Sequence, residues 1–303
     1  MSKPLDRVTL LETFVRIADT GSISAAARDL GLSQPSASRQ LAELEGRLKT
    51  QLMRRNTHSL ALTDAGSDLL ADARQLLDSW EALEEKHLAD GDRIQGKLKV
   101  VAPIALGQLH LAQIAWRFQL QNPGVTLTWE LDDRPIRFAE VGCDCWVKIG
   151  PVPDENLVVR SLGTVERLLV ATAAFVEQHG HPTTPEQAEA LPLVALEPFE
   201  GGRIPLLRAG TPAVPVKPAT RLRTNNIVAL KEATLMGLGM AVMPRWFVAG
   251  ELADGTLLDL LPEWRASPLD INVAYLPGRY QTRRLRCFLD TLQAAVPEID
   301  GVS

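Results

Sequence analysis

The stretch GSISAAARDLGLSQPSASRQLAELEGRL, residues 21–48, combines two patterns on either side of Gly31. Before this glycine, three consecutive alanines indicate a helix that packs closely against another, because alanine lets two helices approach without a clash or a cavity. After it, Ser33 is placed to cap a further helix with Pro35 in its first turn. The apolar stripe of that helix is formed by Ala37, Leu41, Leu44 and Leu48. The stretch therefore predicts two helices joined by a tight turn.

The second of these helices leaves a set of polar groups off its apolar stripe. They gather near the helix N-terminus and comprise Gln34, Ser36, Ser38, Arg39 and Gln40. In a helix-turn-helix this end of the second helix meets base edges and phosphates of DNA. A solvated face in an ordinary three-helix bundle is the alternative that the residues alone leave open.

The segments on both sides of this stretch extend the same unit. Residues 10–18 are apolar at helical spacing and end at Gly21, which predicts a preceding helix. Residues 52–62 are short and partly alternating, which predicts a small hairpin, or wing. We expect Arg54, Arg55 and His58 to lie where a wing contacts the DNA backbone or minor groove. His58 taken alone equally fits a solvated loop histidine.

A long helix follows, capped by Thr63 and extending to about Asp90, or roughly 40 Å. An alternating spacing of four and three residues defines a heptad seam, made of Leu62, Gly66, Leu69, Ala73, Leu76, Trp80, Leu83 and His87. Since nothing in the chain itself is expected to bury this seam, we predict a homodimer in which a second copy covers it. A helix that lies on its own body is the alternative.

After a hinge at residues 91–96 the composition changes, and strands alternate with helical segments. The expected strands are 98–103, 125–131, 143–150 and 167–175. Residues 197–218 are rich in proline and glycine, which indicates irregular structure, and residues 282–295 form an amphipathic last helix. Strands that alternate with helices predict an α/β body.

Charge is divided unevenly along the 303 residues. Residues 1–62 carry nine basic and six acidic side chains, a balance of +3, whereas the chain as a whole carries −5 and the remainder therefore −8. A small basic head on an acidic body is typical of a polyanion-binding module joined to another domain. No apolar run of about 20 residues and no signal peptide is found, so we expect a cytoplasmic protein with no membrane partner.

The sequence contains no signature of catalysis or of metal binding. Its three cysteines do not have zinc-site spacing, and HExxH, GxSxG and a phosphate-binding loop are all absent. GLGMAV, residues 237–242, follows a predicted helix, which favours a helix C-cap over a dinucleotide loop. Cys143 and Cys145 point to one face of a predicted buried strand, and structural thiols are favoured over a redox sensor. We expect no enzyme, no cofactor and no metal.

Taken as a whole, the chain resembles a LysR-type transcriptional regulator. The resemblance is carried by FVRIADTGSISAAARDLGLSQPSASRQLAELEGRLKTQLMRR and LALTDAG, and more loosely by GKLKVVAP, DENLVVRSLG, EATLMGLGMAVMP and DGTLLDLLPEW. It implies an α/β multidomain protein: an all-α winged helix-turn-helix head over 1–62, a dimerising linker helix and hinge over 63–95, and an effector-binding body over 96–303. The body is expected to be two-lobed and similar to periplasmic binding proteins, with lobe I over 96–163 and 267–303 and lobe II over 164–266.

The resemblance also implies which residues bind DNA and effector. Base contacts fall on Gln34, Pro35, Ser38 and Arg39, and the wing-tip arginine of the family is replaced here by His58. Lys49 and Met53 stand where glycine and phenylalanine are usual. The effector positions are Pro103, Ile104, Ala105, Leu106 and Gly107 in a first loop, Lys148, Ile149 and Gly150 at a strand end, and Thr224, Asn225 and Asn226 after LRT.

Three functions are weighed on this basis. A sequence-specific, effector-controlled regulator is favoured over a sequence-tolerant architectural DNA protein, because a balance of +3 supports only weak nonspecific binding. It is also favoured over a solute-binding or enzymatic protein with an N-terminal extension. We expect double-stranded promoter DNA, a small organic anion with an apolar body, further copies of the chain up to a tetramer, and RNA polymerase as partners. Effector binding would shift the lobes and thereby the spacing of the heads.

Overall fold

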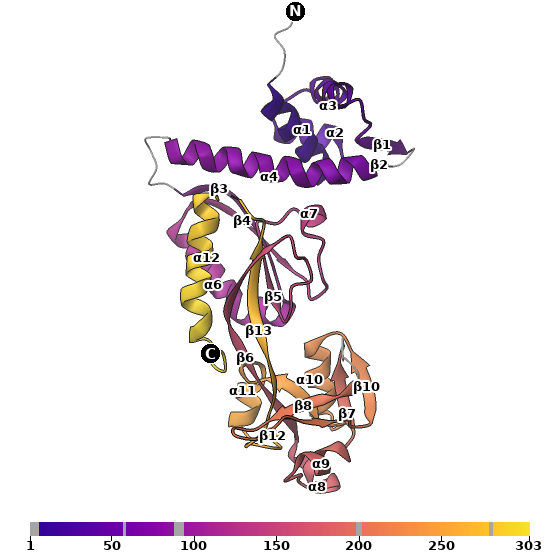
Figure 1. Cartoon of the computed structure of the whole chain (residues 1–303), viewed down its shortest axis with the longest axis vertical. Coiled ribbons are helices and arrows are strands. Elements are labelled where there is room, and N and C mark those ends of the chain that lie inside the picture. Colours follow the sequence, from indigo (N-terminus) through magenta and orange to yellow (C-terminus); the bar gives the residue numbers. More distant parts are fainter. Residues whose placement is uncertain (1–5, 57–58, 88–93, 198–201, 279–280) are drawn as a thin grey trace, which may run out of the picture.

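The computed structural model describes residues 6–56, 59–87, 94–197, 202–278 and 281–303. A helical head lies at one end of the molecule, a long helix runs beneath it, and an α/β body extends away from that helix in two parts (Figure 1). Within the described ranges, no helix is both long and apolar enough to cross a membrane.

Three helices and their caps build the head as the sequence predicts. They are α1 (Arg7–Thr20), α2 (Ile23–Asp29) and α3 (Gln34–Leu48). Gly21 ends α1 in the left-handed conformation, with φ 62°, and the Ser22 hydroxyl accepts a hydrogen bond from Ala25 N. Ser33 caps α3 in the same way, through Ser36 N. The buried alanines Ala26, Ala27 and Ala37 join the core of the head, which confirms their packing role.

The wing and the linker helix follow directly. Strands β1 (Met53–Asn56) and β2 (Ser59–Leu62) pair antiparallel, and α4 (Asp64–His87) begins where the Thr63 hydroxyl accepts from Gly66 N at 2.9 Å. A Cβ at Gly66 would lie 2.1 Å from the Leu52 carbonyl oxygen, so only glycine lets α4 cross the base of the wing so closely. The predicted helix end at Asp90 lies outside the described residues.

The heptad seam of α4 is divided between two environments. Gly66 and Ala73 are buried in the head, where α4 packs against α1 as a fourth helix. Leu76 and Trp80, further along, are 55% and 46% exposed. The expectation that the chain cannot bury its own seam is therefore wrong for the first half of the helix. The second half still presents apolar side chains to solvent.

The part of the body nearest α4 is built on a mostly parallel group of strands. These are β3 (Gln95–Ala102), β4 (Gly124–Leu131) and β5 (Cys145–Ile149), with β3 parallel to both neighbours. Helices α6 (Ala112–Gln121) and α12 (Arg283–Ala295) pack together beside them, where Phe118 and Phe288 meet edge to face at 5.1 Å. We call this part lobe I. It also holds α5 (Ile104–Leu106), the π-helical turn η1 (Gly107–Leu111) and α7 (Phe138–Val141).

The far part of the body, which we call lobe II, differs from the sequence expectations at two places. Its strands are β7 (Leu193–Leu196), β8 (Ile204–Leu207), β9 (Val214–Val216), β10 (Thr220–Thr224), β11 (Ala241–Pro244) and β12 (Leu257–Asp259), and its helices are α8 (Ala173–His179), α9 (Pro185–Glu189), α10 (Ile227–Leu235) and α11 (Arg245–Ala253). The segment 197–218, expected to be irregular, contains β8 and β9, which pair with each other. The strand expected over 167–175 ends at Thr172, because its hydroxyl caps α8 through Phe175 N.

Two long strands carry the chain between the lobes. Strands β6 (Val158–Thr172) and β13 (Arg265–Tyr275) pair antiparallel, and the main sheet runs in the order β11-β6-β13-β5-β3-β4 (Figure 1). The predicted lobe boundaries at 163 and 267 fall inside these two strands. The final turn η3 (Val296–Glu298) leads to the C-terminal residues, where Val302 bridges to Val165 of β6.

Lys49 ends α3 in the left-handed conformation, with φ 53°, at the position where glycine is usual. This conformation costs a non-glycine residue roughly 1–2 kcal/mol, partly offset by the greater freedom of glycine in the unfolded chain. We therefore expect Lys49→Gly to stabilise the head by about 0.5–1 kcal/mol. Hydrogen exchange of the α1 and α3 amides in the full chain measures this. Lys49→Ala removes the same charge without relieving the backbone, so equal stabilisation by both variants would refute the explanation.

Candidate DNA interface and effector site

The first two turns of α3 form the candidate DNA-reading face. Gln34, Pro35 and Arg39 are exposed, while Ser36 and Ser38 are partly buried. The α3 helix lies on the side of the head that faces away from the body (Figure 1). Within the described part of the chain no salt bridge to Arg39 is found, so its guanidinium is available for a base or phosphate. The Ser36 hydroxyl lies 2.8 Å from the Ser33 hydroxyl and so takes part in the cap.

Gln40 does not belong to this face. Its side chain is 5% exposed and accepts a hydrogen bond from the Thr13 hydroxyl of α1. The sequence placed it on the polar flank because glutamine is polar. The structure buries it because α1 supplies a hydrogen-bonding partner across the helix interface.

The wing is attached to α3 by one carboxylate. Glu45 Oε1 accepts from the backbone N–H groups of Leu52 and Met53, at 2.8 and 3.2 Å. Met53 is buried in the head core, so it fills the space that the family usually gives to phenylalanine. Arg54 is exposed and donates to the Leu62 carbonyl at 3.5 Å. The predicted contact through His58, and the side chain of Arg55 in β1, lie outside the described residues.

In lobe I, the first predicted effector segment is largely core. Pro103 is buried, and Ala105 and Leu106 are only 4% and 0% exposed. Helix α5 turns the side chains of Ala105 and Leu106 into the hydrophobic core that includes Leu111, so a ligand contact at these two positions would have to come from their backbone and stays a prediction. The Ile104 N–H donates to Asp133 Oδ1 at 2.9 Å.

In lobe II, the chain caps its own helix at the second predicted segment. Asn226 Oδ1 accepts from Val228 N and Ala229 N, at 3.0 and 3.1 Å, and the Thr224 hydroxyl accepts from Asn226 N. The first amides of α10 are therefore occupied by this cap. Asn225 is exposed and remains available.

Lys148 is the cation among the predicted effector residues. It is partly buried near the end of β5, with its ammonium 5.5 Å from the centroid of the Trp146 ring. Burial lowers the pKa of Lys148, and the charge of Asp133 acts in the opposite direction. In the described part of the chain no carboxylate lies within ion-pair distance of it. The backbone carbonyl of Gly150, two residues further along, is already hydrogen-bonded, since it accepts from Asn272 Nδ2 at 3.0 Å.

The structure thus brings Ile104, Asp133 and Lys148 together, and Asp133 was missed by the sequence analysis. Asp133 follows β4, which runs parallel to β3, and the loop after β3 begins at Pro103. Because the carboxyl ends of adjacent parallel strands share one edge of a sheet, the pair Asp132 and Asp133 directly after a predicted strand was the available signal.

Two buried cysteines lie at the start of β5, with Cys145 as its first residue and Cys143 two residues before it. Cys143 and Cys145 are 6% and 0% exposed. Burial, together with the Asp144 charge, raises the pKa of Cys143 to about 12, and burial raises the pKa of Cys145 well above its ordinary value. Neither thiol is poised to ionise at neutral pH, which argues against a redox role.

Comparison with known proteins decides the family. The model of the LysR substrate binding domain matches residues 91–297, and that of the bacterial regulatory helix-turn-helix protein, lysR family, matches residues 8–67. The chain belongs to the LysR family. It is a DNA-binding transcriptional regulator with a substrate-binding domain, and not an enzyme.

Similar proteins cover nearly the whole chain. The HTH-type transcriptional regulator PtxR of Pseudomonas aeruginosa is 31% identical, over 97% of this chain and 96% of its own. The Escherichia coli HTH-type transcriptional regulator YhjC is 29% identical, over 97% and 99%. Among solved structures, CrgA of Neisseria meningitidis, a LysR-type regulator, is 27% identical with a TM-score of 0.58, covering 96% and 99%. A single-residue variant of full-length OxyR from P. aeruginosa shares the fold, with a TM-score of 0.74 at 16% identity and 99% coverage of both chains.

For the LysR-type head, we expect Arg39→Ala to lower the affinity for the specific operator by about 1–3 kcal/mol, as is typical for loss of one base-contacting arginine. Binding of genomic fragments selected by the wild-type protein, measured at fixed salt, tests this. Arg47→Ala is the matched control, because Arg47 lies at the other end of α3 and pairs with Glu43 at 2.6 Å. If footprints of Arg39→Ala and wild type were the same, Arg39 would not be a base-contacting residue.

Proposed function

We propose that this LysR-family protein binds a specific promoter sequence through the first two turns of α3 and is controlled by a small organic anion bound between the lobes. The observation that carries the DNA part is the exposed row of Gln34, Pro35 and Arg39 on a capped helix beside a wing. Glutamine and arginine can form bidentate hydrogen bonds with adenine and guanine in the major groove. Because its target is promoter DNA, we expect the protein in the cytoplasm. Bound effector would then change the contact of the protein with RNA polymerase.

Sequence-tolerant architectural binding is the weaker candidate. The head has a net charge of only +3, and the rest of the chain has a net charge of −8. Nonspecific affinity depends on neutralising phosphates with many cations and falls steeply with salt. Base readout by α3 therefore has to supply much of the affinity.

Exposed apolar side chains support a homo-oligomer. Leu76 and Trp80 lie one turn apart on α4 and are half exposed, which suits pairing with the linker helix of a second copy. A second apolar group lies on lobe I, where Trp116 and Leu120 of α6 are 46% and 82% exposed and β4 is an edge strand of the main sheet. Two separate apolar surfaces fit a tetramer built from dimers.

The effector proposal is supported by Lys148 and its surroundings. The Lys148 ammonium is partly buried and has no ion-pair partner among the described residues, which favours an incoming carboxylate. Asp133 holds the Ile104 N–H at present, and an effector carboxylate would take its place there while pairing with Lys148. Asn225, exposed at the start of α10, would reach the same ligand when lobe II closes over it. Closure would change the angle between the lobes and hence the spacing of the heads on DNA.

We expect Lys148→Met to lower the affinity for the effector at least tenfold, since a charge-assisted hydrogen bond is lost. A panel of aromatic and aliphatic carboxylates, each with its uncharged amide, is screened by thermal unfolding, because a ligand at about 100 times its Kd adds about 2.7 kcal/mol of stability. Lys217→Met, an exposed lysine of lobe II, is the control. The organic anion would be ruled out if no carboxylate at millimolar concentration stabilised the wild type, or if the amides bound equally well.

A further inference from the structure

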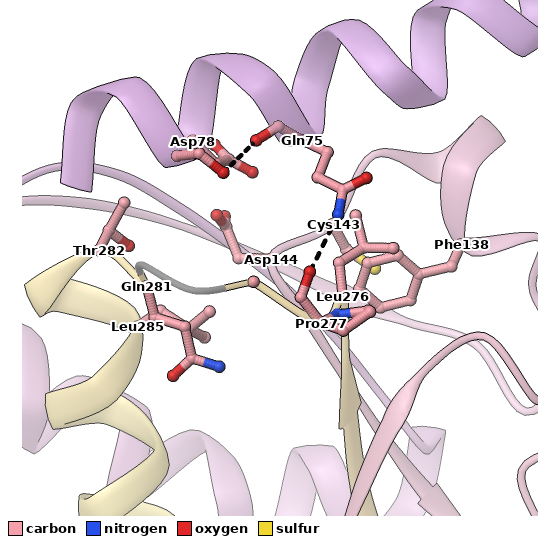
Figure 2. A pocket seen from close by; sticks show the side chains of 12 residues that line it. Gln75, Asp78, Phe138, Cys143, Asp144, Leu276, Pro277, Gln281, Thr282 and Leu285 are labelled. Carbon is pink, nitrogen blue, oxygen red and sulfur yellow. Dashed lines mark hydrogen bonds between the residues drawn. The ribbon is translucent and has the colours of Figure 1, made fainter. Parts of the chain in front are cut away.

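A small cavity lies between α4 and lobe I (Figure 2), and none of the predicted effector residues lines it. Its volume is about 40 Å³, enough for about three water molecules. Four parts of the chain line it: Gln75, Asp78 and Ser79 from α4, Phe138 from α7, Cys143 and Asp144 before β5, and six residues between β13 and the first turn of α12, which are Leu276, Pro277, Gly278, Gln281, Thr282 and Leu285. The Gln75 amide donates to the Pro277 carbonyl at 3.0 Å and closes one side.

Two carboxyl groups meet at this cavity. Figure 2 shows the Asp144 side chain directed from lobe I toward Asp78 on α4. Both side chains are partly buried. One oxygen of Asp144 accepts from the Lys99 backbone N–H at 2.6 Å, and Asp78 forms no ion pair within the described part of the chain. The Thr282 hydroxyl, which also lines the cavity and is 3% exposed, has no hydrogen-bond partner among the described residues.

The Arg284 guanidinium, whose charge acts on both Asp78 and Asp144, already pairs with another carboxylate. Arg284 of α12 is 4% exposed and donates to both carboxylate oxygens of Glu81, at 2.6 and 2.8 Å, and to the Lys97 carbonyl. Its guanidinium also lies 3.8 Å from Glu85. The positive charge at the junction is therefore shared among several carboxylates. A second negative charge on the pair Asp78 and Asp144 has little to compensate it.

We propose that Asp78 and Asp144 share one proton at the junction and that this proton makes the docking of α4 on lobe I dependent on pH. Two carboxylates in one partly dehydrated site cannot both be ionised cheaply, so one of them holds a proton. Consistent with this, burial and the Asp144 charge raise the pKa of Asp78 to about 7, and burial raises the pKa of Asp144. The two groups titrate as a pair.

The charged and titratable groups around the pair come from every element packed against it. They are Arg74, Glu81 and Glu85 of α4, Cys143 and Lys99 of lobe I, Glu130 of β4, and Arg284 of α12. Arg74 pairs with Asp19 of the head, and Lys99 pairs with Glu130 at 2.9 Å. These partners leave the proton as the simplest neutralising species for Asp78 and Asp144.

The direction of the pH effect follows from the docked and released states. When α4 is released into water, Asp78 returns toward its ordinary pKa of 3.8, whereas in the docked state its pKa is about 7. The docked state therefore holds an extra proton between these values. Docking is strongest at the acidic end of this window and weakens as pH rises through 7. Because α4 connects head and body, the proton would act on head position independently of any effector.

Hydrogen exchange of the full chain between pH 5.5 and 8.5, corrected for intrinsic rates, tests the proposal without DNA or effector. The amides of α4 after Gln75, and the Lys99 N–H, are expected to lose protection about tenfold or more as pH rises, since each unit of pKa difference corresponds to a factor of ten. Asp78→Asn, which mimics the protonated acid, should abolish this pH dependence and keep α4 protected at pH 8.5. Asp144→Asn should weaken the pH dependence, because it removes the Asp144 charge but keeps the burial that also raises the pKa of Asp78.

Matched controls separate this pair from other titrating groups. Asp72→Asn changes an exposed carboxylate of the same helix, and His87→Gln changes the exposed histidine at the end of that helix. Both should retain the wild-type pH dependence. Infrared difference spectra at pH 6 should show a protonated carboxyl band that is lost in Asp78→Asn and weaker in Asp144→Asn. Protection independent of pH in the wild type, pH dependence unchanged in both asparagine variants, or absence of that band would overturn the proposal.

Discussion

The buried guanidinium of Arg284 holds the linker helix on the body. It is almost fully enclosed, it donates to both oxygens of Glu81 on α4, and it also donates to the Lys97 carbonyl in β3. Removing Glu81 would leave this enclosed guanidinium without its two shortest carboxylate contacts, which is unfavourable for a charge in a dehydrated site. The position of α4, and with it the cavity beside Asp78, depends on this contact. The helix is therefore part of the body at one end and part of the head at the other.

Arg74 shows how closely the two ends are connected. Its guanidinium pairs with Asp19 of α1, and it passes so close to Gly142 of lobe I that a Cβ there would meet it at 2.1 Å. One side chain of α4 thus contacts both the DNA-binding head and the body. A change in the position of α4 on lobe I would therefore also change the position of the head. An anion near Lys148 and a proton at Asp78 would be two inputs to the same helix.

Local signals in the sequence were sufficient for the head. Gly21 and Ser33 end or cap their helices as expected, because each acts on backbone groups within three or four residues. The expectations from the sequence were wrong where contact with another helix or strand determines whether a residue is buried or paired. Gln40 is buried because of Thr13, and the first half of the α4 seam is covered by α1. The segment 197–218 forms strands because β8 finds a partner in β13.

The amino-acid sequence by itself determined the order of head, linker helix and α/β body, the caps of the head helices and the polar face of α3. Only the tertiary structure decided which groups meet at the proposed sites and at the α4 junction: Asp133 with Ile104, Asp78 with Asp144, and Glu81 with Arg284. The last two residues are 203 positions apart in the chain. Periodicity and capping depend on neighbours along the backbone, whereas burial and charge compensation depend on distance in space, and that is set only once the sheet and helices have packed.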